Sequence, residues 1–247
     1  MKHVEVLNDG SRIGYVELPG NEPVRIFVHG LGSSSLAYYT SVATDPKIAG
    51  QRTLLIDLLG FGISDRQQDF GYSLSEQAAA LASFMDKLEI SKADVIAHSM
   101  GGAIAIMLAS TRPDLVGRLV VCEANLLPTP RPRIDAYSED LYIAEGFAST
   151  LKNIGNIWSV TMRLADPVAM YRSEQSLGKN MPTDLSDRFI NLPMPHAFIQ
   201  GERSPAPHDK DRIVAADIPI ITIPDAGHNM MLDNQDAFIS ALEKVLR

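Results

Sequence analysis

The sequence predicts an α/β protein with a mostly parallel sheet that helices cover on both faces. Short apolar segments alternate with helix-like segments along most of the chain, an order typical of parallel strands joined by helical crossovers. These apolar segments lack the alternation of apolar and polar residues that a half-exposed sheet shows, so both faces of the sheet should be buried. With 247 residues, 45% of them hydrophobic, the chain is long enough to bury a large core.

The first half of the chain supplies most of the expected strands. Asn8-Asp9-Gly10 lies between two strand-like segments, and Asp-Gly in that position is typical of a hairpin. Ser73-Leu74-Ser75-Glu76 is a capping box, and the apolar residues after it recur at helical spacing. The expected strands are 4–7, 13–18, 24–28, 53–56, 93–97 and 119–122, and the expected helices are 74–88 and 101–109.

The composition changes between residues 124 and 191, where strand-like segments disappear. Prolines cluster at Pro128, Pro130 and Pro132, and helix-like pieces follow them. Strands return at 197–200 and 218–223, where Pro219 indicates an edge position or a strand start, and a helix is expected over 232–247. We therefore expect residues 1–124 and 192–247 to form one core domain. Residues 125–191 should form a helical cap over the carboxyl edge of the sheet, where such sheets bind ligands.

A candidate nucleophile lies in the segment Ala97-His98-Ser99-Met100-Gly101-Gly102, which joins an apolar strand to a helix of small residues. A residue at the tip of such a turn takes strained backbone angles and projects its side chain above the sheet. The positions two residues before and after the tip must be small. Ala97 and Gly101 meet that demand, with alanine in place of the more usual glycine. Ser99 at the tip is the candidate; the alternative is a turn that happens to hold a serine.

A serine hydroxyl is a weak nucleophile until a base takes its proton. Of the six histidines, His228 lies just beyond the last strand and before the last helix, in Pro224-Asp225-Ala226-Gly227-His228-Asn229. This position places it at the same edge of the sheet as Ser99. We predict that His228 is the base; the alternative is a loop histidine that caps the following helix.

A tetrahedral intermediate needs backbone N–H donors directed at its oxyanion. The amide of Met100 follows the nucleophile at the start of a helix and is one candidate donor. The amide of Leu31 is the other, because the glycines of His29-Gly30-Leu31-Gly32 let the backbone approach a substrate. The same Gly-x-Gly after a strand also suggests dinucleotide binding, but serine occupies the place of the third glycine.

Taken in order, these motifs resemble those of the α/β-hydrolase superfamily. The likeness rests on His29-Gly30-Leu31-Gly32, the Asp57 to Ser64 loop with Gly60-Phe61-Gly62, the His98 to Gly102 turn, and Gly227-His228. It extends over nearly the whole chain, with 124–191 at the position of the variable cap. The resemblance implies the α/β-hydrolase fold and a triad of serine, acid and histidine, in which Ser99 and His228 match residue by residue.

The acid of the implied triad departs from the commonest pattern. Many members carry an aspartate shortly after Gly-Glu at the end of the penultimate strand, and Ser204 stands there in this chain. The histidine still needs a carboxylate to fix its tautomer. Some members place the acid one strand earlier, where Glu123 follows four apolar residues. We predict Glu123, with Glu202, Asp209 and Asp211 in reserve; the alternative role of Glu123 is to anchor the hinge of the cap.

The expected cap offers the only indication of substrate. Its aromatic and apolar residues beyond those that pack onto the core should line a pocket suited to acyl or aromatic groups. The candidates for this pocket are His98, Trp158 and Met162. Arg131 and Arg133 can hold a substrate carboxylate, although solvated charges at the hinge of the cap are the simpler interpretation.

We predict a serine hydrolase that cleaves a small to medium apolar or aromatic carboxylic ester through an acyl-enzyme. Two alternatives stay open: a C–C bond hydrolase that acts on a diketone-type substrate with the same residues, and a receptor-like protein with little turnover. Dehalogenases and epoxide hydrolases of this superfamily need an aspartate at the position of Ser99, so the serine argues against both.

Composition narrows the classes of partner. The net charge is −8 and no Lys/Arg cluster stands out, which argues against nucleic acid or an anionic membrane. The single cysteine, Cys122, excludes an internal disulfide and is expected in the core. We expect no metal and no other cofactor, because the His, Asp and Glu spacings match no metal site. Without a signal peptide or an apolar span, a cytoplasmic monomer or homodimer acting on a small molecule is expected.

Overall fold

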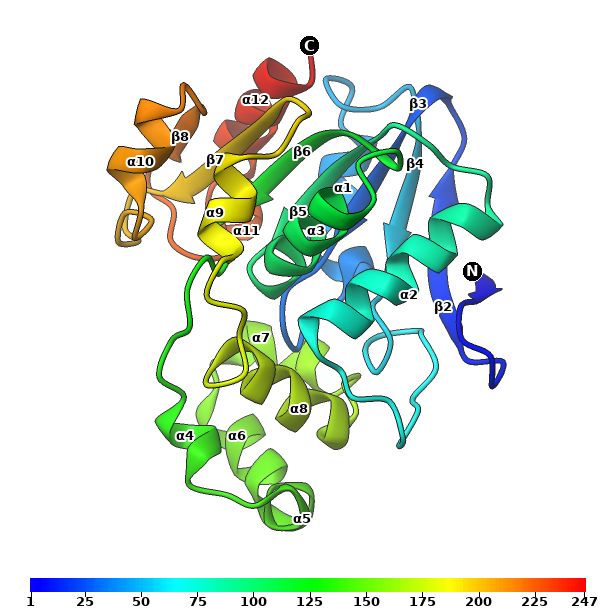
Figure 1. Ribbon diagram of the computed structural model, residues 1–247, viewed down its shortest axis with the longest axis vertical. Helices are drawn as coiled ribbons and strands as arrows, with labels where there is room; N and C mark the ends of the chain where they lie inside the picture. The colour runs from blue at the N-terminus through cyan, green and yellow to red at the C-terminus, as the bar shows by residue number, and fades with distance from the viewer.

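The computed structural model describes the backbone of all 247 residues and every side chain except those of residues 156 and 157. An eight-stranded sheet with the order β1-β2-β4-β3-β5-β6-β7-β8 forms its centre (Figure 1). Strand β2 pairs antiparallel with β1, as the predicted hairpin, and also antiparallel with β4, whereas the other five strand pairs are parallel. The bounds are β1 Lys2–Glu5, β2 Arg12–Leu18, β3 Asn21–Val28, β4 Gln51–Ile56, β5 Ala93–His98, β6 Val116–Cys122, β7 His196–Gly201 and β8 Ile220–Ile223.

Helices cover both faces of this sheet, as predicted. Successive side chains of a central strand enter different cores: Val24, Ile26 and Val28 pack on one face and Phe27 on the other. The first core also contains apolar residues of α2 (Leu74–Lys87) and α3 (Met100–Thr111). The second contains those of α1 (Ser35–Thr44), α11 (Met230–Asp233) and α12 (Gln235–Leu246). Burial on both faces explains why the strands carry no alternating pattern.

The chain between β6 and β7 is helical, and residues 125–191 are called the helical insert below. Figure 1 shows α4 to α8 grouped beyond one end of the sheet, whereas α9 packs against α3. A π-helical turn, Tyr142–Gly146, lies between α5 and α6. The helices are α4 Pro132–Asp135, α5 Glu139–Leu141, α6 Phe147–Asn153, α7 Asn156–Met162, α8 Pro167–Leu177 and α9 Leu185–Ile190.

Several helices differ from the expectations. The helix expected over 232–247 is two helices, because Asn234 has non-helical angles and its side chain accepts the amide of Ala237 at 3.2 Å as the cap of α12. The sequence pattern does not predict helix α1. Its buried positions recur at helical spacing but carry serine, tyrosine and alanine beside a single valine, so the apolar signal was weak. The pattern does not predict helix α10 (Lys210–Ala215) either, because Ile213 is its single buried residue.

Candidate active site

Ser99 occupies the tip of the turn between β5 and α3. Its φ of 52° and ψ of −119° lie outside the regions that residues with a side chain favour, as predicted for the tip of a tight turn between a strand and a helix. Its amide donates to the carbonyl oxygen of Cys122 on the neighbouring strand at 2.9 Å. A Cβ at position 101 would overlap the carbonyl oxygen of His29, so glycine is required there. The half-buried Ser99 side chain lines a cavity.

Three predicted residues from distant segments meet at this point. Nε2 of His228, in the loop between β8 and α11, lies 3.1 Å from Oγ of Ser99. Nδ1 of the same ring lies 2.7 Å from Oε2 of Glu123, which directly follows β6. Because a carboxylate only accepts, Nδ1 carries the proton and Nε2 is left to accept from the serine hydroxyl. The arrangement can withdraw a proton from Ser99.

The carboxylate of Glu123 is fixed from several sides. Its Oε1 accepts the amide of Gly201 at 2.8 Å, and Ser204 also donates to it. Burial raises the pKa of Glu123, but the hydrogen bonds from His228, Gly201 and Ser204 outweigh burial and the net pKa is lowered. Ser204, at the position where many members carry the acid, therefore supports the acid of the neighbouring strand.

The reserve carboxylates have other partners. Glu202 accepts the amide of Asp225 at 3.0 Å, and Asp209 forms an ion pair with Arg212 at 3.6 Å. Asp211 lies exposed in the first turn of α10. In the described structure, the carboxylate that forms an ion pair with His228 is that of Glu123.

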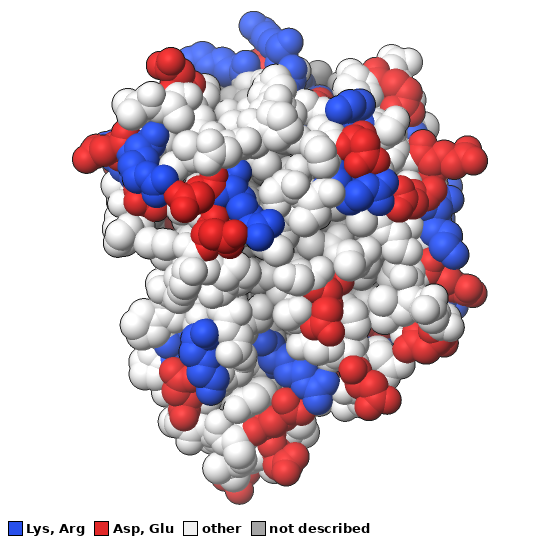
Figure 2. Space-filling model, viewed as in Figure 1, with Lys and Arg blue, Asp and Glu red and all other residues white. Residues whose placement is uncertain are grey.

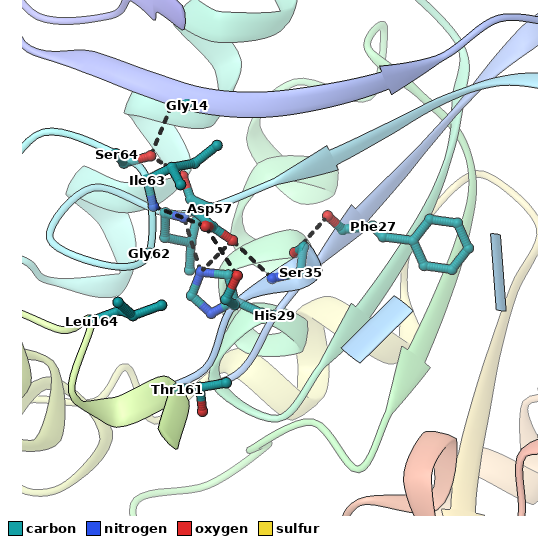
Figure 3. A network of polar contacts seen from close by, with 12 residues as sticks. Gly14, Phe27, His29, Ser35, Asp57, Gly62, Ile63, Ser64, Thr161 and Leu164 are labelled. Carbon is teal, nitrogen blue, oxygen red and sulfur yellow. Dashed lines mark hydrogen bonds and ion pairs between the residues drawn. The ribbon is translucent and has the colours of Figure 1, made fainter. Parts of the chain in front are cut away.

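The loop after β3 is held by a buried polar network around His29 and Asp57 (Figure 3). The ring Nε2 of His29 accepts the amide of Leu58 at 3.0 Å, so Nδ1 carries the proton and donates to the carbonyl oxygen of Gly30 at 2.7 Å. Asp57 accepts the amide of Ser35 at 2.8 Å. Burial lowers the pKa of His29 despite the nearby Asp57 carboxylate, in agreement with a neutral ring.

This network sets the direction of the Leu31 amide. The carbonyl of Gly30 and the N–H of Leu31 belong to one planar trans peptide, so they point in opposite directions. Because His29 holds the carbonyl, the N–H is turned away from the His29 ring. Met100 occupies the first turn of α3, where amides have no partner within the helix. Leu31 lines the same cavity as Ser99, and Met100 directly follows Ser99 in the chain, so both residues lie next to the nucleophile. That their amides bind an oxyanion stays a prediction.

Helix α7 of the helical insert holds the next two carbonyls of the same loop. Nε1 of Trp158 donates to the carbonyl oxygen of Leu31 at 3.2 Å. The hydroxyl of Thr161 donates to the carbonyl oxygen of Gly32 at 3.1 Å. The carbonyls of three successive residues, 30 to 32, are therefore each held by a side-chain hydrogen bond. One donor belongs to the core and two belong to the helical insert.

The cavity beside Ser99 has a volume of about 290 Å³, at the lower end of the range for small-molecule sites. Trp158 and Met162, both predicted to lie in the pocket, line it together with Ile154. Arg131, Arg133 and Glu174 form a polar part of its wall. A larger hollow of about 830 Å³ lies on the surface of α2 and α3 and includes neither Ser99 nor His228.

The prediction that His98 lines this pocket needs correction, because the side chain is buried beneath the site. Only 2% of its surface is exposed, and its Nε2 donates to the carbonyl oxygen of His228 at 2.8 Å. Burial, assisted by the charge of His228, lowers the pKa of His98 to about 3. A neutral ring therefore supports the loop of His228. A single sequence does not reveal which side of a tight turn faces the interior.

Other groups have no evident chemical role. Cys122 is fully buried and burial raises the pKa of its thiol, which suits the predicted core position. The described residues contain no group of three His, Cys, Asp or Glu side chains arranged to hold a metal ion.

On the face of the molecule in Figure 2, positively and negatively charged side chains are interspersed. Among the described residues, none of the helices combines the length and the apolar composition that a membrane span requires.

Comparison with curated proteins finds hydrolases among the relatives. The chain is 25% identical over 252 residues to an sn-1-specific diacylglycerol lipase from Mus musculus, an alignment that covers 91% of this chain and 81% of the lipase. It is 32% identical over 118 residues to a 2-hydroxymuconate semialdehyde hydrolase from Pseudomonas sp. strain CF600, covering 47% of this chain and 41% of that enzyme. The second match therefore spans less than half of the relative's length. These relatives support hydrolase activity.

Solved structures and the family profile agree with this result. A thermophilic esterase from Thermogutta terrifontis superimposes with a TM-score of 0.81 at 19% identity, covering 100% of this chain and 98% of the esterase, which shows the shared fold. The profile of the alpha/beta hydrolase fold family matches residues 23–211. The sheet order, the strained serine turn and these matches together show that the chain belongs to the α/β-hydrolase fold family.

Proposed function

We propose that the protein is a serine hydrolase that cleaves small to medium carboxylic esters with apolar or aromatic groups through an acyl-enzyme. The observation that carries the proposal is the chain of contacts from Ser99 Oγ through the His228 ring to Glu123, with distances of 3.1 and 2.7 Å. Ser99 and His228 line a cavity that has Trp158 and Met162 in its wall.

In the acylation step, Oγ of Ser99 attacks the ester carbonyl carbon while Nε2 of His228 takes the hydroxyl proton. The negative charge that develops on the carbonyl oxygen is stabilised by the amides of Leu31 and Met100. The C–O bond of the ester then breaks, and His228 returns its proton to the departing alkoxide. Glu123 stabilises the imidazolium and keeps Nδ1 protonated.

Deacylation repeats these roles with water as the nucleophile. Nε2 of His228 takes a proton from water, hydroxide adds to the acyl carbon, and the tetrahedral intermediate uses the same two amides. Collapse returns the proton to Oγ of Ser99 and releases the carboxylic acid. The cavity of about 290 Å³ suits a short acyl group better than a long chain.

A second candidate is C–C bond hydrolysis of a diketone-type substrate. The match to the 2-hydroxymuconate semialdehyde hydrolase favours it, although that alignment covers 41% of the relative. The same serine, histidine and backbone amides would serve, since a tetrahedral intermediate forms at a carbonyl in both reactions. The two candidates differ in the bond that is cleaved.

The test combines a covalent probe with a substrate panel. A fluorophosphonate should label the wild-type protein and fail to label Ser99→Ala, while Ser83→Ala on α2 should label as the wild type does. p-Nitrophenyl esters of rising chain length should be hydrolysed fastest when the acyl chain is short. Absence of labelling would remove the serine hydrolase proposal. Turnover of a vinylogous diketone without turnover of esters would replace ester cleavage with C–C cleavage.

A further inference from the structure

Two arginines and one glutamate lie together in the wall of the cavity that Ser99 lines. The Glu174 side chain is only 4% exposed, and it forms ion pairs with Arg131 at 3.3 Å and with Arg133 at 3.2 Å. Arg131 uses Nη1 for this pair and Arg133 uses Nη2, on different oxygens of the carboxylate. All three residues line the same cavity as Ser99 and His228.

The charges in this cluster do not balance. Two guanidinium groups face one carboxylate, so the cluster carries one uncompensated positive charge. Among the described residues that line the cavity, Glu174 is the only carboxylate, and both of its oxygens are already engaged. Nε of Arg131 is buried and has no hydrogen-bond partner among the described groups. This Nε is enclosed by protein and is not open to the cavity, so it is the excess positive charge of the two guanidinium groups that favours an anionic ligand.

Local structure holds the arginines in place. Arg131 lies between Pro130 and Pro132, directly before α4, and Arg133 directly follows Pro132, so prolines restrict the backbone around both arginines. Glu174 lies on α8, and Gly178 follows that helix. A Cβ at Gly178 would lie 3.2 Å from Cγ of Arg131, so the glycine leaves room for the arginine stem.

We propose that Arg131 and Arg133 form a carboxylate subsite, so that the preferred substrate is an ester whose acyl chain carries a carboxylate a few carbon atoms from the scissile carbonyl. This inference rests on the proposed function and specifies its substrate class. The apolar wall at Trp158 and Met162 contacts the carbon chain, and the guanidinium groups bind its far end through charge-assisted hydrogen bonds. The cavity is small enough for a short chain to reach both Ser99 and the arginines.

The test compares monomethyl glutarate with methyl glutaramate, its uncharged carboxamide counterpart of nearly equal shape. In the wild type, kcat/KM for the anionic ester should exceed that for the neutral ester by about 10- to 100-fold, chiefly through KM. The ratio should fall toward one in Arg131→Gln and shrink as salt is raised. Glu174→Gln, which removes the competing carboxylate, should keep or raise the ratio. Arg163→Gln, an exposed arginine of the same insert outside the cavity wall, should not change it.

A binding measurement separates failure of the subsite from failure of the proposed function. Calorimetry should show that glutarate binds to Ser99→Ala and binds at least about tenfold more weakly to Ser99→Ala/Arg131→Gln. Thermal melting checks that each variant is folded, and Arg131→Met, which also removes the charge, replaces Arg131→Gln if the latter does not fold.

If both esters are hydrolysed with a ratio near one and glutarate does not bind, the subsite is wrong and the hydrolase proposal stands. If neither ester is hydrolysed and Ser99 does not react with the fluorophosphonate, the proposed function fails. In that case, arginine-dependent glutarate binding would still support the subsite, and its absence would overturn the subsite as well.

Discussion

The ring of His98 packs against the ring of His228, with centroids 4.5 Å apart, while its Nε2 donates to the main-chain carbonyl oxygen of the same residue at 2.8 Å. A buried neutral side chain thus holds both the ring and the backbone of the candidate base. Nδ1 of His98 lies toward the loop after β3, since a Cβ at Gly30 would be 2.9 Å away from it. His98 therefore connects the loops of Leu31 and His228 beneath Ser99.

Replacing His98 should lower turnover through the position of His228. In His98→Ala the carbonyl of His228 loses its donor and a cavity opens, so we expect kcat to fall by about tenfold or more with a small change in KM. His98→Gln keeps a side-chain N–H and should recover part of kcat. Steady-state kinetics on the best ester of the panel measures both. Equal kcat in His98→Ala and the wild type would show that the contact has no positioning role.

The same residue predicts a dependence of stability on pH. Because the pKa of His98 is about 3 in the folded protein, against 6.5 as its ordinary value, the unfolded chain binds more protons between these values. Stability should therefore fall as the pH is lowered from about 6.5 toward 3. In His98→Gln this contribution is absent, and the Tm should vary less with pH in that window. Parallel slopes for the wild type and the variant would contradict the assignment of a buried neutral ring.

Substitution of Glu123 tests the assignment of the acid. Glu123→Gln keeps the shape of the side chain but allows the wrong tautomer of His228, so kcat should fall by about 10³- to 10⁴-fold. Glu202→Gln and Asp209→Asn change carboxylates that pair elsewhere, and both should stay within about twofold of the wild type. The measurement is kcat at pH 7 with matched thermal melting. A large loss in Asp209→Asn with full activity in Glu123→Gln would reverse the assignment.

The two donors of α7 should affect catalysis rather than only stability. Thr161→Val removes the hydrogen bond to Gly32, and Trp158→Phe removes the one to Leu31, so each should lower kcat by about 3- to 10-fold. Thr150→Val is the control, because Thr150 is a buried threonine of the same insert that does not contact the loop after β3 in the described structure. A control that loses as much kcat as Thr161→Val would show a general effect of the insert.

The parts that could be predicted from the sequence are those encoded locally. The order of strand, tight turn and helix places Ser99 at the carboxyl edge of the sheet, and the position of His228 after the last strand places it at the same edge. Because serine stands at position 204 where many members carry aspartate, Glu123 is the predicted acid. The structure brings these three together, and their catalytic roles stay predictions. The extent of the cap likewise stays a prediction, although α9 packs against the core.

What could not be predicted depends on contacts between distant segments. Arg133 pairs with Glu174, which lies 41 positions later in the sequence. The local sequence around Arg131, with its prolines, does not indicate that a buried residue of α8 is the partner. The interpretation of these arginines as solvated charges fits Arg133, whose side chain is 52% exposed, but it did not include their ion pairs with the buried Glu174. His98 was misplaced for a similar reason, because its burial depends on the packing of the His228 loop.

The position of Glu123 at the end of β6 has a consequence for the tolerance of the scaffold to change. The distance between the hydroxyl and the carboxylate depends on the register of one strand pair, in which His98 faces Cys122 and both flanking residues continue into the site. That pair is complete before the helical insert begins. The segment after β7 therefore does not have to supply the carboxylate that pairs with His228. Exchange of the insert for another, or lengthening of the chain after Pro205, should alter which molecules are admitted while the spacing of the Ser99 hydroxyl and the Glu123 carboxylate is preserved. A new insert would also have to supply donors to the carbonyls of Leu31 and Gly32.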